Sequence, residues 1–277
     1  MEIQQSPLFV QYIKKLGWTT EKIGKYTIFI KSFFFMGAIG KLQRTTSLPS
    51  SKEIIALIKK HRIRLLVIEP DSKISSKAFS LWIDHIKPYV RISTAHYLST
   101  KTIRVNLTPS EEDIFHNFSE AKRRAVRRAK SLGVTIKESS DIQKLLTFKA
   151  KTAGFLGSLT TYGVKELWPI FSPENATILL AYNKRDIVVA GVLLLYWDNV
   201  SYYWIVGATK EGKKLFAPTL LVWESLKTAK KKECTSFDFI GVWDERLPKE
   251  NLGWKGFTKF KEGFGGKELY YPLLKNS

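Results

Sequence analysis

The stretch TILLAYNKRDIVVAGVLLLYWDNVSYYWIV, residues 177–206, decides the fold. It contains three runs of β-branched, aliphatic and aromatic residues, which is the composition typical of strands. Two short polar segments rich in Asn and Asp separate the runs, and these residues favour turns. Connections this short join antiparallel neighbours, so the stretch predicts a three-stranded meander. The predicted strands are residues 177–182, 187–196 and 200–206, joined by turns at 183–186 and 198–199.

Two predicted helices precede the meander. Apolar residues recur at helical spacing through 110–132 and again through 142–153. The segment Thr108-Pro109-Ser110-Glu111 fits a capping box with proline at the first helical position, and Gly133 fits a helix end. We therefore expect one long helix over 110–132, followed by a second helix.

After the meander, Pro218 opens a predicted helix over 219–232, and residues 237–240 read as a further strand. A loop rich in glycine, lysine and aromatic residues follows at 241–266, and 269–273 reads as a last strand. Two helices, three antiparallel strands, a helix and a strand in this order resemble an acyltransferase domain of the GNAT type.

The first hundred residues also alternate helix and strand, and 277 residues suit two domains. We expect an α/β (α+β) fold of two tandem GNAT-like domains, with mixed, mostly antiparallel sheets flanked by helices. The predicted domains are 1–103, completed by 262–277, and 104–261. The N-terminal elements are expected at 8–16, 26–35, 52–61, 64–68, 75–88 and 103–107.

Charge and composition limit the function classes. Lys and Arg number 45 against 25 Asp and Glu, which gives a net charge of +20 and favours a polyanionic partner. A basic but otherwise ordinary enzyme is the plainer interpretation. The one cysteine, Cys234, excludes a disulfide framework, and the four histidines lack ligand spacing, so no metal site is expected.

The N-terminus lacks the apolar run of a signal peptide, and no apolar stretch reaches the roughly 20 residues that span a bilayer. We therefore expect a cytoplasmic protein, whose charge allows peripheral contact with a membrane surface.

The second half of the predicted 110–132 helix is crowded with cations. Like charges four positions apart on a helix repel each other unless an anion lies nearby, so a contact with a phosphate backbone is the functional interpretation. The alternative is an exposed helix whose long side chains cover apolar surface. The expected tRNA-binding residues are Lys122, Arg123, Arg124, Arg127, Arg128 and Lys130.

The stretch LGWKGFTKFKEGFGG, residues 252–266, interleaves aromatic residues with lysines. Such a pattern suits stacking on bases beside phosphate contacts. The alternative is that the aromatic residues belong to the core. By contrast, the turn ATKEGKKLFAPT at 208–219 has a single glycine, where enzymes that use coenzyme A cradle a pyrophosphate with a Gly-rich turn. An acetyl-coenzyme A donor is therefore disfavoured.

Several motifs resemble the FemABX family of peptidoglycan peptidyltransferases, and the resemblance covers essentially the whole chain. The most specific pair is FDFIGV at 237–242 with FKEGFGG at 260–266. Weaker matches are Gln5-Ser6 with Leu16-Gly17-Trp18, the strand 103–107 before the basic helix, and Phe216-Ala217-Pro218. The chain lacks an arginine around 155–163 that the branch acting on UDP-linked precursors carries, and it lacks a coiled-coil insertion.

The resemblance implies an aminoacyltransferase of the EC 2.3.2 type that adds an amino acid to the stem peptide of a peptidoglycan precursor. The implied partners are aminoacyl-tRNA, as co-substrate in place of a cofactor, and a UDP-linked or lipid-linked muropeptide. Lys261 would be catalytic, preceded by the aromatic Phe260. The implied substrate-binding residues are Lys14, Lys15, Arg44, Glu69 and Tyr162.

An ordinary lysine is a cation at pH 7, so we expect Lys261 to stabilise the oxyanion or the departing ribose oxygen rather than to act as a base. Two other transferases stay open: a GNAT-like N-acyltransferase with a thioester donor, and an aminoacyl-tRNA:protein transferase. A nucleic-acid-binding module without catalysis would explain the charge but not the FKEGFGG motif.

Overall fold

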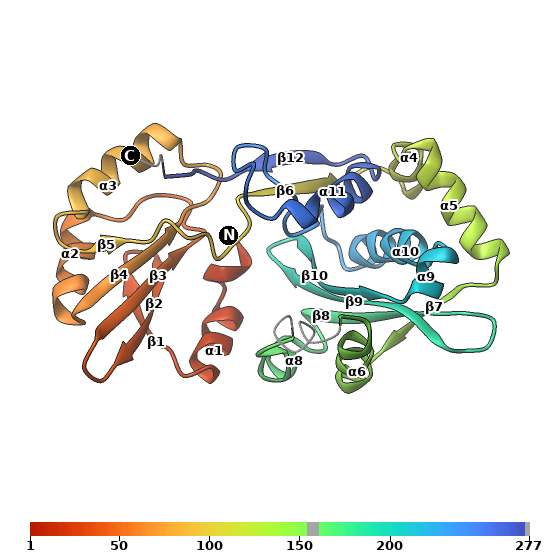
Figure 1. The fold of residues 1–277 in the computed structure, drawn as a ribbon, viewed down its shortest axis with the longest axis horizontal. Coiled ribbons are helices and arrows are strands. Elements are labelled where there is room, and N and C mark those ends of the chain that lie inside the picture. Colours follow the sequence, from red (N-terminus) through yellow and green to blue (C-terminus); the bar gives the residue numbers. More distant parts are fainter. Residues whose placement is uncertain (154–160, 275–277) are drawn as a thin grey trace. The chain divides into compact units, whose positions relative to one another are not determined.

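The computed structural model describes residues 1–153 and 161–274, and the chain divides into two compact units (Figure 1). Unit 1 comprises Met1–Lys101 with Leu269–Ser277, and unit 2 comprises Thr102–Glu268. Each unit is built on one mixed sheet flanked by helices, which confirms the predicted α/β architecture. Within the described ranges, no helix has both the length and the apolar character needed to cross a bilayer.

Unit 1 has a five-stranded sheet in the order β1-β2-β3-β4-β5. The first three strands pair antiparallel, whereas β3, β4 and β5 run parallel, so this sheet is less antiparallel than expected. Two amphipathic helices, α2 (Ser51–Lys60) and α3 (Ser76–Ile86), bury their apolar residues against the sheet. The strands are β1 (Thr19–Ile23), β2 (Tyr26–Phe33), β3 (Gly37–Gln43), β4 (Ile63–Glu69) and β5 (Arg91–Ile92).

The chain enters unit 1 through a short 3-10 turn, η1 (Ile3–Gln5), and helix α1 (Pro7–Lys15). Ser6 caps this helix because its hydroxyl accepts a hydrogen bond from the Phe9 amide, with proline at the first position. The predicted helix over 8–16 is thereby confirmed.

Unit 2 has a seven-stranded sheet in the order β12-β6-β11-β10-β9-β8-β7. The predicted meander lies within it as β8 (Ala176–Tyr182), β9 (Val188–Trp197) and β10 (Val200–Ala208), paired antiparallel. These strands are buried almost throughout, which is why their sequences read as continuous apolar runs. The remaining strands are β6 (Lys101–Asn106), β7 (Thr135–Ser139), β11 (Ser236–Asp238) and β12 (Lys267–Tyr270).

Two features of this sheet position the candidate site. The register of β10 against β9 is irregular between Tyr203 and Ile205, and β11 pairs parallel with the first residues of β10. Figure 1 shows helices α10 (Ala217–Lys231) and α6 (Ile142–Ala153) on opposite faces of β8–β10. The other helices are α4 (Glu111–His116), α5 (Glu120–Ser131), α8 (Val164–Phe171), α9 (Lys210–Lys214), η3 (Leu252–Trp254) and α11 (Lys255–Glu262).

The single long helix predicted over 110–132 is wrong. The chain forms two helices, α4 and α5, because Ser119 starts the second by accepting a hydrogen bond from the Lys122 amide. Ser110 is the cap of α4, so Pro109 precedes the cap instead of occupying the first helical position.

The predicted loop at 241–266 is also corrected. Its second half forms η3 and α11, so Lys261 lies on a helix rather than in a glycine-rich loop.

The assignment of residues 262–268 to the N-terminal domain is wrong as well. Phe264 is fully buried in the core of unit 2, where it contacts Phe118 and Phe239, and only Leu269–Ser277 belong to unit 1. The other boundary lies between Lys101 and Thr102 rather than at 103/104.

Candidate functional site

Lys261 is the buried cation at the centre of the candidate site. It lies in the last turn of α11 and only 8% of its surface is exposed. Its Nζ donates hydrogen bonds to the Phe239 carbonyl, 2.9 Å away, and to the Gly241 carbonyl, 2.6 Å away. The lysine therefore bridges the turn that follows strand β11.

Asp238, the last residue of β11, holds that turn in place. Its carboxylate accepts hydrogen bonds from Thr102 Oγ1 at 2.6 Å, Arg104 Nε at 2.7 Å and the Ile240 amide at 2.7 Å. The turn needs this support because Ile240 adopts a φ of 47°, which is unfavourable for a β-branched residue. Gly241 follows with a φ of 86°.

A second tie links the turn to α11. Thr258, one helical turn before Lys261, accepts a hydrogen bond from the Trp243 amide at 2.7 Å. The carbonyls that receive the lysine and the helix that carries it are thus fixed to each other on both sides. Such preorganisation is what a catalytic cation requires.

Burial lowers the pKa of the Lys261 ammonium from 10.5 to about 8, and the charge of Asp238 opposes this shift. The lysine is therefore mostly charged at pH 7. Since two of its three N–H groups are used by carbonyls, one N–H is left to face a substrate oxygen. The arrangement suits stabilisation of negative charge, as the sequence predicts.

Phe260 precedes Lys261 and joins the basic helix to the site. Its ring lies 3.8 Å from the Nζ of Lys122 and packs on Phe264. Burial lowers the Lys122 pKa to about 8. Lys122 is thus a packing partner of the lysine-bearing helix, and its ammonium covers the aromatic pair.

The glycines of FKEGFGG are explained by close approach to neighbouring backbone. A Cβ on Gly265, whose φ is 76°, would lie 2.6 Å from the Asn117 carbonyl oxygen, and a Cβ on Gly266 would lie 2.4 Å from the Ile103 side chain. The amide of Ser119 also donates to the Gly263 carbonyl at 2.9 Å. The motif therefore seats α11 against β6 and the start of α5.

The six cations predicted to bind tRNA divide into two groups. Lys122 is half-buried, and Arg123 Nη1 donates to the His116 and Phe118 carbonyls, which closes the end of α4. The other four, Arg124, Arg127, Arg128 and Lys130, are exposed. Only this second group has the exposure that a long polyanion needs.

Three of these exposed arginines line a shallow open groove of about 620 Å³. Phe216 closes the groove; it is partly exposed, adopts a φ of 56° and directly precedes α10. The groove thus combines positive charge with an exposed ring. Its lining is Ala121, Arg124, Ala125, Arg127, Arg128, Ser131 and Phe216.

The turn between β10 and α10 offers no nest of free amides for a pyrophosphate. It folds into helix α9, where the Gly212 amide donates to Thr209 Oγ1 and the Leu215 amide to the Glu211 carbonyl. Gly212 is required for packing, because a Cβ there would lie 2.2 Å from the Val189 carbonyl oxygen. The single glycine of this turn therefore serves the fold.

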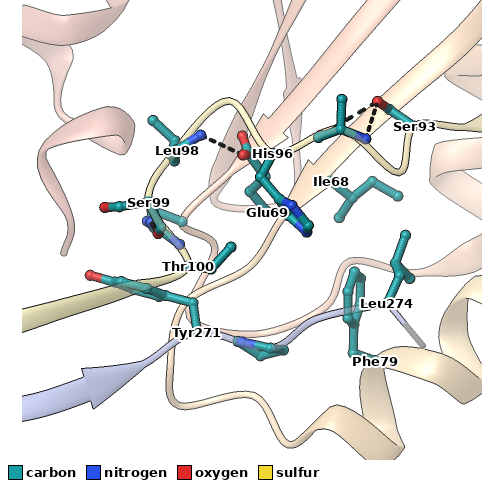
Figure 2. Close-up of a pocket in the computed structure, with 13 residues that line it drawn as sticks. Ile68, Glu69, Phe79, Ser93, His96, Leu98, Ser99, Thr100, Tyr271 and Leu274 are labelled. Atoms are coloured by element: carbon teal, nitrogen blue, oxygen red, sulfur yellow. Dashed lines mark hydrogen bonds between the residues drawn. The ribbon is translucent and has the colours of Figure 1, made fainter. Parts of the chain in front are cut away.

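In unit 1, the predicted residues Arg44 and Glu69 lie at the same small cavity (Figure 2). Glu69 Oε1 accepts hydrogen bonds from the Tyr97 and Leu98 amides at 2.7 and 2.6 Å, and its Oε2 accepts one from Gln43 Nε2 at 2.6 Å. Figure 2 shows the Leu98 amide pointing at this carboxylate. Glu69 therefore holds the segment that follows β5.

Arg44 is equally engaged. Its Nη2 donates to the Ser99 carbonyl at 2.6 Å, and its guanidinium lies 3.3 Å from the centre of the Tyr271 ring. The cavity measures about 20 Å³, which is room for a single water molecule and not for a sugar or peptide. In this conformation both residues brace the loop, and their direct contact with substrate stays a prediction.

The remaining predicted residues lie elsewhere. Lys14 and Lys15 are exposed in the last turn of α1, and neither lines the cavity at Glu69. Tyr162 is 73% exposed in unit 2, just before α8. Within the stretch 155–163, residues 155–160 lie outside the described residues.

Two further residues, one in each unit, were not assigned roles from the sequence. Asp238 belongs to the FDFIGV motif, yet nothing in the motif alone tells that its carboxylate holds the turn that Lys261 bridges. Lys41 is partly buried between the Trp18 and Tyr97 rings, at 4.8 and 4.5 Å, where burial lowers its pKa. The alternation of side chains along β3 indicates only which face of the strand Lys41 lies on. The described residues contain no cluster of three or more His, Cys, Asp or Glu able to hold a metal ion.

Comparisons with known proteins agree with this geometry. The model of the FemAB family matches residues 174–269, which include β8–β11, the turn after β11 and α11. No sequence of a curated protein matches the chain.

Solved structures share the fold over nearly the whole chain. FemX superimposes with a TM-score of 0.73 at 14% identity, covering 98% of this chain and 90% of its own. The C-terminal domain of a putative lysylphosphatidylglycerol synthetase from Agrobacterium fabrum gives 0.59 at 10% identity, covering 97% and 86%. A tandem GNAT protein from the clavulanic acid biosynthesis pathway gives 0.53 at 7% identity, covering 90% and 79%. The tandem GNAT-like fold is thereby confirmed, and the segment 174–269 is similar to the FemAB family.

Proposed function

We propose that this protein transfers an aminoacyl group from aminoacyl-tRNA to an amine on the stem peptide of a peptidoglycan precursor. The observation that carries the proposal is Lys261: a buried ammonium, fixed by two backbone carbonyls, inside the segment that matches the FemAB family. A preorganised cation of this kind is suited to acyl transfer through an oxyanion.

The reaction is aminolysis of an ester. The acceptor amine, on the third residue of the stem peptide, attacks the ester carbonyl, and a tetrahedral oxyanion forms. Collapse of this intermediate breaks the bond to the ribose oxygen, which takes up the proton lost by the amine. Lys261 supplies its free N–H to the oxyanion or to the departing ribose oxygen, and Phe260 packs the helix that carries it.

The tRNA side of the site is the arginine groove of α5. Arg124, Arg127 and Arg128 face solvent there and are suited to backbone phosphates, while Phe216 offers a ring for stacking. Lys130 extends the positive charge of the same helix. Lys122 and Arg123 support the groove indirectly, because their side chains are engaged with α11 and α4.

The acceptor side is assigned to unit 1. Lys14 and Lys15 are available for precursor phosphates, and Arg44 and Glu69 brace the loop that follows β5. Tyr162 is exposed and remains a candidate for substrate contact. A cytoplasmic location, where charged tRNA and precursors are both present, is part of this proposal.

A thioester-dependent N-acyltransferase is the main competing function. The α9 turn argues against it, because the Gly212, Lys213 and Leu215 amides donate within the turn and are not free to bind a pyrophosphate. An aminoacyl-tRNA:protein transferase would use the same donor and differs only in its acceptor.

The test is competition between donors. Purified protein would be offered radiolabelled charged tRNA or radiolabelled acetyl-coenzyme A, each with UDP-linked and lipid-linked muropeptide. The proposal expects RNase-sensitive transfer from tRNA and none from acetyl-coenzyme A. Transfer from the thioester alone would refute it, and transfer from tRNA only to a polypeptide amine would move the acceptor to the competing class.

A further inference from the structure

The hairpin between β2 and β3 ends in four exposed apolar side chains. Phe34 is 95% exposed, Phe35 90%, Met36 73% and Phe33 39%. The tip connects the two paired strands. The rings of Phe34 and Phe35 contact each other edge to face, with 4.5 Å between their centroids, and both rings stay exposed to water. Such contiguous exposure of large apolar residues marks an interaction surface.

Cations surround the base of this hairpin. Gly37, which closes the turn, lies against the side chain of Arg64, and the Ala38 amide donates to the carbonyl of Arg62. Both arginines are exposed at the start of β4. On the other side, Lys31 Nζ donates to the Gly17 carbonyl at 2.7 Å, which brings the end of α1 to the same edge of the sheet.

This end of α1 adds two further exposed cations, Lys14 and Lys15. The tip is therefore an apolar wedge with five cations around its base: Lys14, Lys15, Lys31, Arg62 and Arg64. The acidic residue of β1, Glu21, lies further along the strand, opposite Ile28, where it pairs with Lys60 and His61.

We infer that the β2–β3 hairpin inserts into the surface of an anionic lipid bilayer, with Phe34, Phe35 and Met36 among the acyl chains and the five cations at the headgroups. Aromatic side chains favour the interface between lipid and water, and basic residues beside them are attracted by anionic headgroups. The net charge of +20 adds long-range attraction to the same surface.

A second copy of the chain fits this tip less well. A stable dimer needs about 800 Å² of buried surface on each partner, and four side chains on one turn supply only part of that. Two copies would also bring like charges together, because the tip is ringed by cations. The apolar wedge and its positive surroundings complement a bilayer instead.

Membrane docking bears on the acceptor. A protein held at the membrane by unit 1 would act on the lipid-linked form of the precursor, whose pyrophosphate lies at the headgroup level within reach of the same cations. This consequence rests on the proposed function, whereas insertion of the hairpin does not.

The test is sedimentation with vesicles of phosphatidylcholine alone or mixed with phosphatidylglycerol. The variant F34S/F35S removes the two rings at the tip, and L81S/Y89S removes two exposed apolar side chains elsewhere on unit 1 as a matched control. Each inserted ring contributes about a tenfold factor or more to partitioning, so the tip variant should bind anionic vesicles roughly 100-fold more weakly. The control should bind like the unaltered protein, and binding should weaken with salt.

Insertion would be read directly from a dye attached to Phe35→Cys, since Cys234 is buried and unreactive by comparison. Quenching by lipid-borne quenchers supports the inference. Equal vesicle binding of the tip variant and the control would overturn it, and so would no binding by the unaltered protein. Concentration-dependent self-association that F34S/F35S abolishes, without vesicle binding, would assign the tip to a second copy and also overturn it.

A failure of the membrane inference can be distinguished from a failure of the proposed function. Under the membrane inference, F34S/F35S lowers transfer to lipid-linked precursor in vesicles and leaves vesicle-free transfer to a soluble precursor analogue unchanged. Lys261→Met, by contrast, should lose transfer in both assays and still bind vesicles. If neither protein transfers, vesicle binding alone still decides the role of the hairpin.

Discussion

Lys261→Met is the substitution that isolates the cation from its packing. Methionine fills a similar volume and keeps an unbranched side chain on α11, but it has no N–H groups. The Phe239 and Gly241 carbonyls then lose their shared donor, and a substrate oxyanion would face no positive charge. A preorganised donor of this kind contributes about 3–4 kcal/mol, so the transfer rate should fall by about 10² to 10³.

The same substitution should leave the fold nearly as stable. Lowering the Lys261 pKa from 10.5 to about 8 means that burial of the charge costs about 3 kcal/mol at neutral pH, and methionine removes that cost. Against this gain, two carbonyls left without a partner cost about 1–3 kcal/mol each. The two effects oppose each other, so we expect only a small change in melting temperature.

The assay is single-turnover transfer from charged tRNA, with thermal unfolding measured in parallel. A rate within about threefold of the unaltered protein, in a folded variant, would refute the role given to Lys261. Lys259→Met is the matched control, because that lysine is exposed on the same helix and should transfer normally.

Three further predictions follow from the same structure. The transfer rate should fall above about pH 8, because Lys261 loses its proton there. The free energy of unfolding should rise with pH between about 8 and 10.5, because in this range the unfolded lysine binds more protons than the folded one. A transfer rate that keeps rising through pH 9 would contradict the cationic role. Replacing the three groove arginines by alanine (R124A, R127A, R128A) should weaken tRNA binding and reduce the slope of log affinity against log salt by about 2.7. The control replaces three exposed lysines of unit 1 (K52A, K73A, K77A) and should change the slope less. Equal slopes in the two sets of variants would count against the groove. Gly265→Ala should destabilise the protein by about 1–3 kcal/mol in urea unfolding, because its φ is 76° and its Cβ would meet the Asn117 carbonyl. Gly253→Ala, whose Cβ meets nothing within 4 Å, should leave the stability nearly unchanged. A larger loss of stability in Gly253→Ala than in Gly265→Ala would show that the motif does not pack as described.

The sequence predicts the sheet of unit 2 well because β8–β10 are continuous apolar runs with short polar turns, and local pattern is enough to define such strands. It fails between α4 and α5, because Asn117 to Ser119 read as helix by periodicity. The break there depends on a serine cap and on contacts of Gly263 and Gly265 that come from far along the chain.

The site shows the same division. The FKEGFGG motif identifies Lys261, but the burial that lowers its pKa comes from tertiary packing, and so does its pairing with two carbonyls. Charge alone does not separate the exposed Arg127 from the engaged Arg123, since both lie in one basic run. The exposure of Phe34 and Phe35 is equally hidden, because their run reads as the end of a strand.

The most direct test of the account is where the new aminoacyl group is found. Muropeptide would be incubated with protein and a pool of charged tRNAs, and the product would be sequenced by tandem mass spectrometry. The account predicts one added aminoacyl residue on the side-chain amine of the third residue of the stem peptide, absent with Lys261→Met and after RNase treatment. An unmodified stem peptide, in the presence of intact charged tRNA and folded protein, would contradict it.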